Sequence, residues 1–122
     1  MLCESCGINF IDNYYREGLY PLPDGAVHGA EAGGVVSACP ENLKKEWLNK
    51  RVVFSHIGGF AEYTLVPVSK LISVPDDVPL PTALALTVMG LTAHYLCTSV
   101  GNIKKGQHGE SIESLINGGR VN

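Results

Sequence analysis

Residues 51–74 of the chain read RVVFSHIGGFAEYTLVPVSKLISV. Three short runs of strand-forming residues lie within this stretch, and turn residues separate them: 51–54, 60–66 and 71–74. A fourth run of the same kind, at 34–38, precedes them. Short strands that follow one another closely between turns are typical of a small barrel or a folded sheet. The stretch therefore predicts a mostly β domain.

The segments around these strands predict loops and one longer helix. Residues 7–27 are rich in Gly, Pro, Asn, Asp and Tyr, which indicates a loop with one helical turn around 12–17. The polar connector 40–50 could hold another single turn. After the strands, acidic residues and an early Pro favour a helix start, and we expect a helix over 82–98. Gly90 in its middle predicts a break or a close backbone contact there.

Length and charge exclude several classes of protein. The 122 residues suit one domain, with 45% apolar and 17% charged side chains. The net charge of -3 and nine scattered Lys and Arg residues give no footprint for nucleic acid. The N-terminus lacks the basic start and apolar stretch of a secretory signal, so a cytoplasmic location is expected. Residues 78–103 carry no charge, but Pro, Thr and Gly interrupt them, so no membrane span is expected.

The four cysteines give only half of a usual metal-site pattern. Cys3 and Cys6 form one Cys-x-x-Cys pair, whereas Cys39 and Cys97 stand alone. Disulfide frameworks belong to small secreted domains, and nothing in the sequence indicates secretion. Reduced thiols are expected. A small metal-binding module built on Cys3, Cys6, Cys39 and a histidine stays open as one alternative.

Five motifs occur in a fixed order along residues 6–106: CGINFIDNYYREGLYP at 6–21, GAEAGGVV at 29–36, RV at 51–52, GFAEY at 59–63 and GLTAHYL at 90–96. Together they resemble the motifs of the zinc-independent quinone oxidoreductases in the medium-chain dehydrogenase/reductase superfamily. The resemblance implies a GroES-like catalytic domain that packs against a Rossmann domain, with NADPH in the cleft between them. It also implies reduction of a small-molecule quinone by hydride transfer.

The resemblance implies a set of cofactor-binding residues but no catalytic proton relay. Four of the predicted contacts lie in the first motif and one lies in the last: Asn9, Asp12, Tyr14, Tyr20 and Thr92. Taken without the family, the same residue types have a plainer interpretation, because loop Asn and Asp often cap turns and clustered tyrosines often pack half-buried. Gly7, Gly18 and Gly90 are expected where the backbone is crowded or has a positive φ.

The same motifs argue against a catalytic zinc. In the alcohol dehydrogenase branch of the superfamily, a cysteine and a Gly-His-Glu sequence supply metal ligands. The corresponding places here read Asn9 and Gly29-Ala30-Glu31. An amide and a methyl group do not replace a thiolate and an imidazole around zinc. No metal is therefore expected.

The chain also departs from the family pattern at both ends. The family begins upstream of Met1, so residues 1–106 are expected to be a GroES-like domain that is incomplete at its N-terminus. The Gly-rich turn that would hold the cofactor phosphates is missing after Gly106, and Gly118-Gly119 does not replace it. We expect the Rossmann domain to be absent and residues 107–122 to form a divergent, disordered tail.

Without that domain the chain is expected to be a fragment that is inactive alone, and the family's homodimer is not expected for it. Two alternatives to quinone reduction remain open. One is a non-catalytic interaction fragment that keeps the GroES-like fold. The other is an enone or alkene reductase of the same superfamily, because nothing in these residues separates such substrates from quinones.

Overall fold

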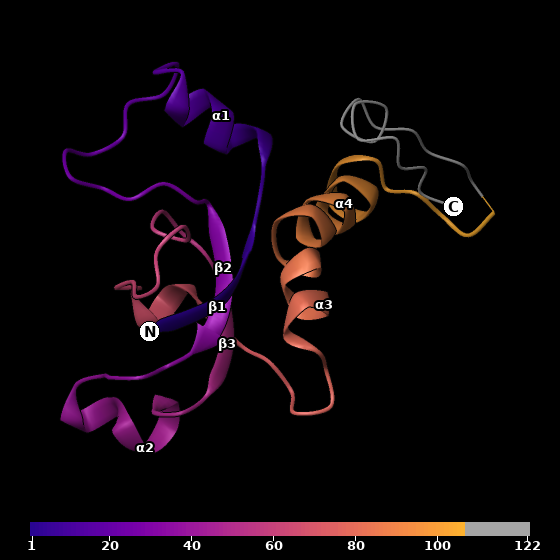
Figure 1. Ribbon diagram of the computed structural model, residues 1–122. Coiled ribbons are helices and arrows are strands. Elements are labelled where there is room, and N and C mark those ends of the chain that lie inside the picture. Colours follow the sequence, from indigo (N-terminus) through magenta and orange to yellow (C-terminus); the bar gives the residue numbers. More distant parts are fainter. Residues whose placement is uncertain (107–122) are drawn as a thin grey trace. The chain divides into compact units, whose positions relative to one another are not determined.

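The computed structural model describes residues 1–106 and contains an antiparallel sheet of four strands (Figure 1). The strands follow one another in the sheet in the order of the sequence: β1 (Leu2–Gly7), β2 (Glu31–Val35), β3 (Arg51–Ser55) and β4 (Leu71–Ser73). Within the described residues β1 and β4 do not pair, so the sheet stays open. A mostly β fold followed by a helical region, expected from the sequence as part of a barrel, is confirmed.

Small residues in β2 let its neighbours come close. Gly34 lies against the carbonyl group of Leu2 on β1, where a side chain would collide with the backbone. On the other face, a Cβ at Gly33 would lie 3.1 Å from Leu80 Cδ1. These glycines explain how β2, whose three middle residues are small, can still be nine-tenths or more buried along most of its length.

Helix α3 (Leu80–Ala85) packs on one face of the sheet, where it contacts β1, β2 and β3 (Figure 1). Its Leu80 and Leu84 pack with Val53 and Val74 as the buried core of this face. Burying each such side chain contributes about 1.5–3 kcal/mol. The Arg51 guanidinium secures the connection before the helix, because it donates hydrogen bonds to three backbone carbonyl groups there, two of them 3.2 Å long and one of 2.8 Å.

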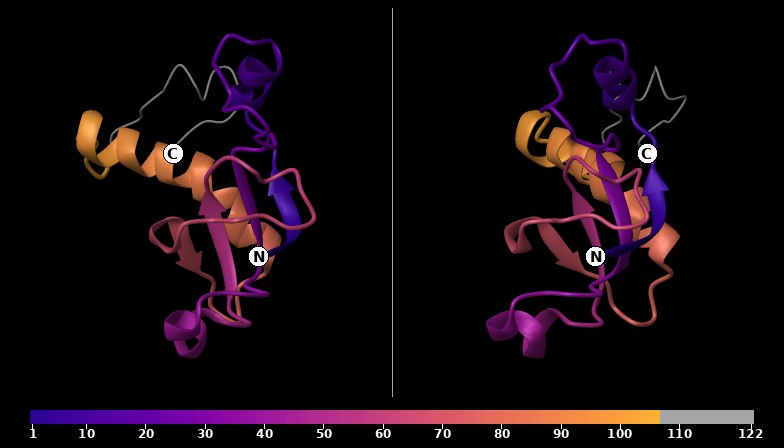
Figure 2. Two further views of the ribbon diagram at one scale, coloured as in Figure 1. Left: turned by 90° about the vertical axis from the view of Figure 1, so that its left-hand side faces the viewer. Right: turned by 60° about the vertical axis from the view of Figure 1, so that its left-hand side comes forward.

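Residues 62–64 lie along the outer edge of β1 (Figure 2). The amide of Cys3 donates to the carbonyl group of Glu62 over 2.8 Å, and the amide of Thr64 donates to that of Met1 over 3.0 Å. The sequence predicted a strand over 60–66, and this prediction is wrong. The segment forms only an isolated bridge between Leu2 and Tyr63, because the chain turns away on either side of it.

The other expected elements differ mainly in their bounds. The strands at 51–54 and 71–74 and the turn in 40–50 are confirmed, the last as the 3-10 turn Glu41–Leu43 and α2 (Lys44–Trp47). The strand expected at 34–38 begins three residues earlier, at Glu31. The helical turn expected at 12–17 is α1 (Phe10–Arg16). Strand β1 was not expected.

The helical region after the sheet alternates between two helix types. α3 is followed by a π turn (Leu86–Gly90), α4 (Leu91–Tyr95) and a second π turn (Leu96–Val100). The change at Gly90 agrees with the expected break, but this residue has φ -67° and ψ -44°, so no positive φ explains its identity. The sequence excluded a membrane span, yet Leu80–Val100 is long and apolar enough for one by length and composition. A core helix of a soluble protein passes the same test, so the feature assigns no location.

The chain divides into two compact units, Met1–Val88 and Met89–Asn122. The first unit contains the whole sheet, α1 and α3. The second contains α4 and the π turn that follows it. The expected tail at 107–122 lies outside the described residues.

Candidate functional site

The Asp12 carboxylate is buried within the segment that carries four of the predicted cofactor contacts. Its side chain is at the third position of α1, and the residue is 7% exposed. One oxygen, Oδ2, accepts a hydrogen bond from the backbone amide of Asn9 over 2.8 Å. The other, Oδ1, accepts one from the Ala30 amide over 2.9 Å. Asp12 therefore joins the start of α1 to the residue just before β2.

Glu31 is a second buried acid, and it lies next to the first. It is 4% exposed at the start of β2. Its Oε1 accepts a hydrogen bond from the Asn9 side-chain amide over 3.0 Å, and its Oε2 accepts one from the Val88 backbone amide over 3.0 Å. Val88 belongs to the first π turn, and a π turn changes the regular backbone pairing of a helix. Glu31 therefore links α1 to the helix after the sheet.

Gly7 leaves the room that the Glu31 side chain needs. A Cβ at this position would overlap the carboxyl group of Glu31. The expectation that Gly7 marks a crowded backbone position is confirmed. Among the described residues, every buried side-chain nitrogen and oxygen has a hydrogen-bond partner. Each carboxylate oxygen of the two acids thus has a partner, and both acids hold Asn9 in place.

The predicted tyrosines form an exposed aromatic cluster at the other end of α1. The rings of Tyr14 and Tyr20 meet edge to face, with centroids 5.7 Å apart and an interplanar angle of 88°. Tyr15 also contacts Tyr20, at 6.1 Å. Gly18, with φ +75°, turns the chain back so that the amide of Leu19 reaches the carbonyl group of Tyr14 over 2.9 Å. The positive φ expected at Gly18 is confirmed.

Much of this aromatic surface faces solvent. Tyr14 is 39% exposed, and Tyr20 and Phe10 are each 50% exposed. Leu19 beside them is 65% exposed. Edge and face contacts between rings leave flat surfaces on which a further planar group can pack. The exposed side chains of Phe10, Tyr14, Leu19 and Tyr20 thus form an aromatic platform on the α1 segment. The buried carboxylates of Asp12 and Glu31 hold the start of this segment in place.

Thr92, the fifth predicted contact, belongs to the second compact unit. It lies on α4 and is half-buried. The structure therefore brings together Asn9 with Asp12, and Tyr14 with Tyr20. The contact of Thr92 with a cofactor stays a prediction.

Sequence reasoning missed Glu31 as a site residue, although it noted the motif around it. The signal was present, because an acid within Gly29-Ala30-Glu31-Ala32-Gly33-Gly34 is a single charge in a run of small residues. A strand of that composition packs tightly on both faces. A charged side chain there needs buried partners, and this requirement identifies it as part of a network.

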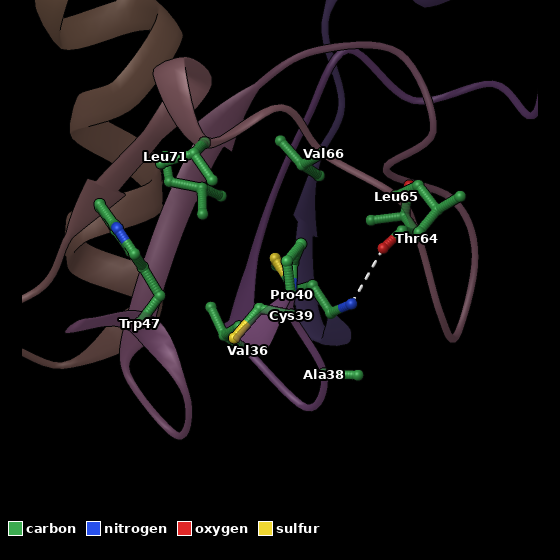
Figure 3. Close-up of a pocket in the computed structure, with 11 residues that line it drawn as sticks. Val36, Ala38, Cys39, Pro40, Trp47, Thr64, Leu65, Val66 and Leu71 are labelled. Atoms are coloured by element: carbon green, nitrogen blue, oxygen red, sulfur yellow. Dashed lines mark hydrogen bonds between the residues drawn. The ribbon is translucent and has the colours of Figure 1, made fainter. Parts of the chain in front are cut away.

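A hollow lies elsewhere in the first unit. It has a volume of about 320 Å³, and eleven residues line it: Met1, Val36, Ala38, Cys39, Pro40, Trp47, Thr64, Leu65, Val66, Val68 and Leu71. Trp47 and Leu71 lie on one side of it and Thr64 and Leu65 on the other (Figure 3). The terminal ammonium donates to the Thr64 carbonyl group over 2.9 Å. None of the five predicted cofactor contacts lines this hollow, so it is separate from the aromatic platform.

The described residues do not support the alternative of a multi-cysteine metal module. They contain no group of three or more His, Cys, Asp or Glu side chains that could hold a metal ion. The set of Cys3, Cys6, Cys39 and a histidine is therefore not assembled. All four cysteines are free thiols. Burial raises the pKa of the Cys3 thiol above its ordinary value, and Cys6 raises it further, whereas the terminal ammonium opposes both effects.

Comparison with known proteins identifies the fold. The sequence model of the alcohol dehydrogenase GroES-like domain matches residues 2–76, and the chain belongs to this family. A probable quinone oxidoreductase of Schizosaccharomyces pombe is 37% identical over 102 residues, which cover 82% of this chain and 31% of that protein. The resemblance to quinone oxidoreductases of the medium-chain dehydrogenase/reductase superfamily, drawn from five motifs, is thereby confirmed.

Solved structures agree with this assignment. The quinone oxidoreductase of Pseudomonas syringae pv. tomato matches with a TM-score of 0.78 at 35% identity, over 86% of this chain and 33% of that one. Escherichia coli quinone oxidoreductase, solved with NADPH, matches with a TM-score of 0.71 at 34% identity, over 78% of this chain and 30% of that one. The chain thus spans about a third of the length of the relatives it matches.

Proposed function

We propose that this chain is the GroES-like part of an NADPH-dependent quinone oxidoreductase, and that the α1 segment packs against the reacting rings. The observation that carries the proposal is the aromatic platform around Tyr14 and Tyr20, held in place through Asp12 and Glu31. Residues 1–106 would form the catalytic domain. The grip on the cofactor phosphates would come from a Rossmann domain that these residues do not contain.

The residues of the platform suit a planar, weakly polar ring. The nicotinamide and quinone rings are flat, and exposed edge-to-face tyrosines offer both apolar faces and hydroxyl groups. When bound, NADPH supplies a hydride, and the quinone becomes a hydroquinone once it also gains a proton. The platform fits the ring end of such a cofactor only. Among the described residues, no Gly-rich turn opens a helix that could hold a pyrophosphate.

The chain's own contribution is orientation rather than acid or base chemistry. Asn9 is fixed because its backbone amide binds Asp12 and its side-chain nitrogen binds Glu31. Asn9 and Asp12 also form a capping box at the start of α1, which fixes Asn9 further. The tyrosine rings exclude water from one side of a packed ring. Holding two reactants in a fixed geometry is a major source of rate acceleration when the cofactor performs the chemistry.

The test uses the longest natural polypeptide that contains this sequence. Its oxidation of NADPH is followed at saturating 1,4-benzoquinone, with NADH and a simple enone as the comparison cofactor and substrate. The expected result is oxidation of NADPH that depends on the quinone and falls at least tenfold in kcat/KM for Asn9→Ala. Asn13→Ala, one helical turn further along α1, is the matched control and should keep the rate.

Three other outcomes separate the alternatives. Faster turnover of the enone than of the quinone would replace quinone reduction by alkene reduction. Oxidation of NADPH that Asn9→Ala leaves unchanged would remove the α1 segment from the site. No turnover with either substrate would overturn the proposal and favour the interaction fragment.

A further inference from the structure

A β-bulge places two thiols on the same face of the sheet. Cys3 lies opposite Gly34, and the next paired residue, Ser5, lies opposite Gly33, so Glu4 is the extra residue of the bulge. Cys6 then lies opposite Ala32. Without the bulge, residues three apart in a strand point to opposite faces. With it, the two cysteines occupy alternate paired positions and share a face.

The partner strands fix which face this is. Gly34 pairs with Val52 and Ala32 pairs with Phe54, so both cysteines lie on the side of Val52 and Phe54. This side is opposite the α3 helix, because the intervening pair of Gly33 and Val53 lies against Leu80. The thiols therefore lie away from the main core cluster. Cys6 is exposed and Cys3 is half-buried, so both can be reached from solvent.

The spacing of the two thiols suits a bridging atom better than a direct bond. Their partners Gly34 and Ala32 are alternate positions of β2, which lie about 6.6 Å apart at about 3.3 Å per residue, and the two cysteines opposite them have a similar spacing. Disulfides usually require a Cα separation of about 4.4–6.8 Å with a mode near 5.5–6 Å, so this pair is at the upper limit. A cation held between two sulfur atoms lengthens the bridge by about two metal–sulfur bonds, each near 2.3 Å as for zinc.

We propose that Cys3 and Cys6 form a two-coordinate site for a soft monovalent cation, Cu(I). Thiolates are the ligands that select Cu(I), and Cu(I) accepts two of them. Zinc needs four ligands in structural sites, and the described residues gather no group of three. On binding, each thiol loses its proton to solvent and forms one Cu–S bond, so the metal keeps its oxidation state. The inference does not depend on the proposed oxidoreductase activity.

The electrostatic surroundings agree with two close thiols. Burial is the main cause of the raised pKa of Cys3, and the Cys6 thiol is close enough to add to this effect. Glu4, on the bulge between the two cysteines, is exposed and can stay solvated. Neither His nor a third Cys competes for the metal within the described residues.

The test titrates the full chain anaerobically into the Cu(I) complex of bicinchoninate and follows the loss of its colour. The wild type is expected to withdraw about one Cu(I) per chain. Cys3→Ser and Cys6→Ser should each weaken the binding at least tenfold, because a single thiolate remains. Cys39→Ser and Cys97→Ser are the controls and should bind as the wild type does.

A second measurement covers the case in which a serine variant does not fold. Cu(I) added to the wild type should protect Cys3 and Cys6 from maleimide, as read by peptide mass spectrometry, while Cys39 and Cys97 stay reactive. The proposal is overturned if the wild type withdraws no Cu(I), if Cys39→Ser removes the binding, or if the protected cysteines are others. A disulfide between Cys3 and Cys6 in the metal-free chain handled under nitrogen would also overturn it.

Discussion

The Glu31 carboxylate accepts a hydrogen bond from the backbone amide of Val88, 57 residues further along the chain, over 3.0 Å. Its other oxygen holds the Asn9 side chain. One buried side chain thus connects the entry of α1, the start of β2 and a π turn. This is the connection on which the shape of the aromatic platform depends.

Glu31→Gln tests this connection. A glutamine keeps one acceptor oxygen and replaces the other by an NH2 group. This group would face either the side-chain NH2 of Asn9 or the backbone N–H of Val88, and both of these are donors. Leaving a buried donor unsatisfied costs about 1–3 kcal/mol, so the urea midpoint should fall accordingly. Glu62→Gln removes the same charge at an exposed position and should change stability by less than about 0.5 kcal/mol. Equal midpoints for the two variants would contradict this role for Glu31.

Asp12→Asn should destabilise the loop rather than the sheet. An NH2 group would replace one of the two acceptor oxygens. This donor would face the backbone N–H of Asn9 or of Ala30, which would lose its acceptor. Backbone hydrogen exchange at these two positions should become faster, and the free energy of unfolding should fall by about 1–3 kcal/mol. The control is Asp24→Asn on the exposed loop, which should leave both amides protected. Unchanged exchange at Asn9 and Ala30 would rule out this loop-holding role.

Gly29→Ala should be among the most damaging single changes in the first unit. Gly29 has φ +100°, and a Cβ there would lie 2.5 Å from the Phe60 backbone nitrogen, which cannot move aside. Strain of about 1–2 kcal/mol and overpacking of about 1–3 kcal/mol should add. Gly25→Ala is the control, because Gly25 also has a positive φ, +75°, but a Cβ there would meet no atom within 4 Å. This variant should therefore show the backbone strain without the overpacking. Thermal melting that shifts equally in both variants would show that the clash is relieved.

Tyr20→Leu should affect ligand binding more than stability, because the ring is half exposed. Loss of an aromatic contact worth about 0.5–1.5 kcal/mol predicts a fall of about twofold to thirteenfold in kcat/KM for the proposed quinone reduction by the longest natural polypeptide. Tyr20→Phe keeps the ring and should retain most of the rate. The matched surface control is Tyr63→Leu, because Tyr63 is 61% exposed and lies on the segment beside β1. A rate lost in Tyr63→Leu but kept in Tyr20→Leu would place the site elsewhere.

The thiol of Cys3 predicts a dependence of stability on alkaline pH. Its pKa in the folded chain is raised, chiefly by burial, so folding favours the protonated thiol. The resulting stability is fully present below the ordinary pKa of cysteine, near 8.5, and is lost as pH rises through the folded value. Urea midpoints compared between neutral and alkaline pH should fall more for the wild type than for Cys3→Ser. An equal fall in both chains would assign the pH effect to other groups.

Much of the fold could be predicted because the apolar residues of β3 and β4, among them Val52, Val53, Phe54 and Ile72, form short runs between clear turns. The predicted bounds of β2 were too late in the sequence because Val35 and Val36 have the stronger strand propensity. The observed strand begins at Glu31, among small residues that its closely packed neighbours require. β1 has a weak pattern because the bulge at Glu4 interrupts its alternation. Its pairing partners are distant in the sequence, so no local signal reveals it.

The sequence predicted which residues would belong to the candidate site, and it did not indicate how these residues contact the rest of the fold. The motif around Asn9 and Asp12 indicated a cleft. It did not indicate that both carboxylate oxygens of Asp12 accept hydrogen bonds from backbone amides. That assignment depends on Ala30, which is 18 residues away. Contacts across such separations follow from the tertiary fold, so a single sequence does not specify them.

The segment at 62–64 has a consequence for how the chain behaves in concentrated solution. By pairing with Met1 and Cys3, it covers the N-terminal end of the outer edge of β1, where a bare strand would invite copies of the chain to stack. The opposite edge, β4, is only three residues long. So short an edge gives a neighbouring strand little to pair with, and the chain is thereby protected from growing into fibrils through its sheet.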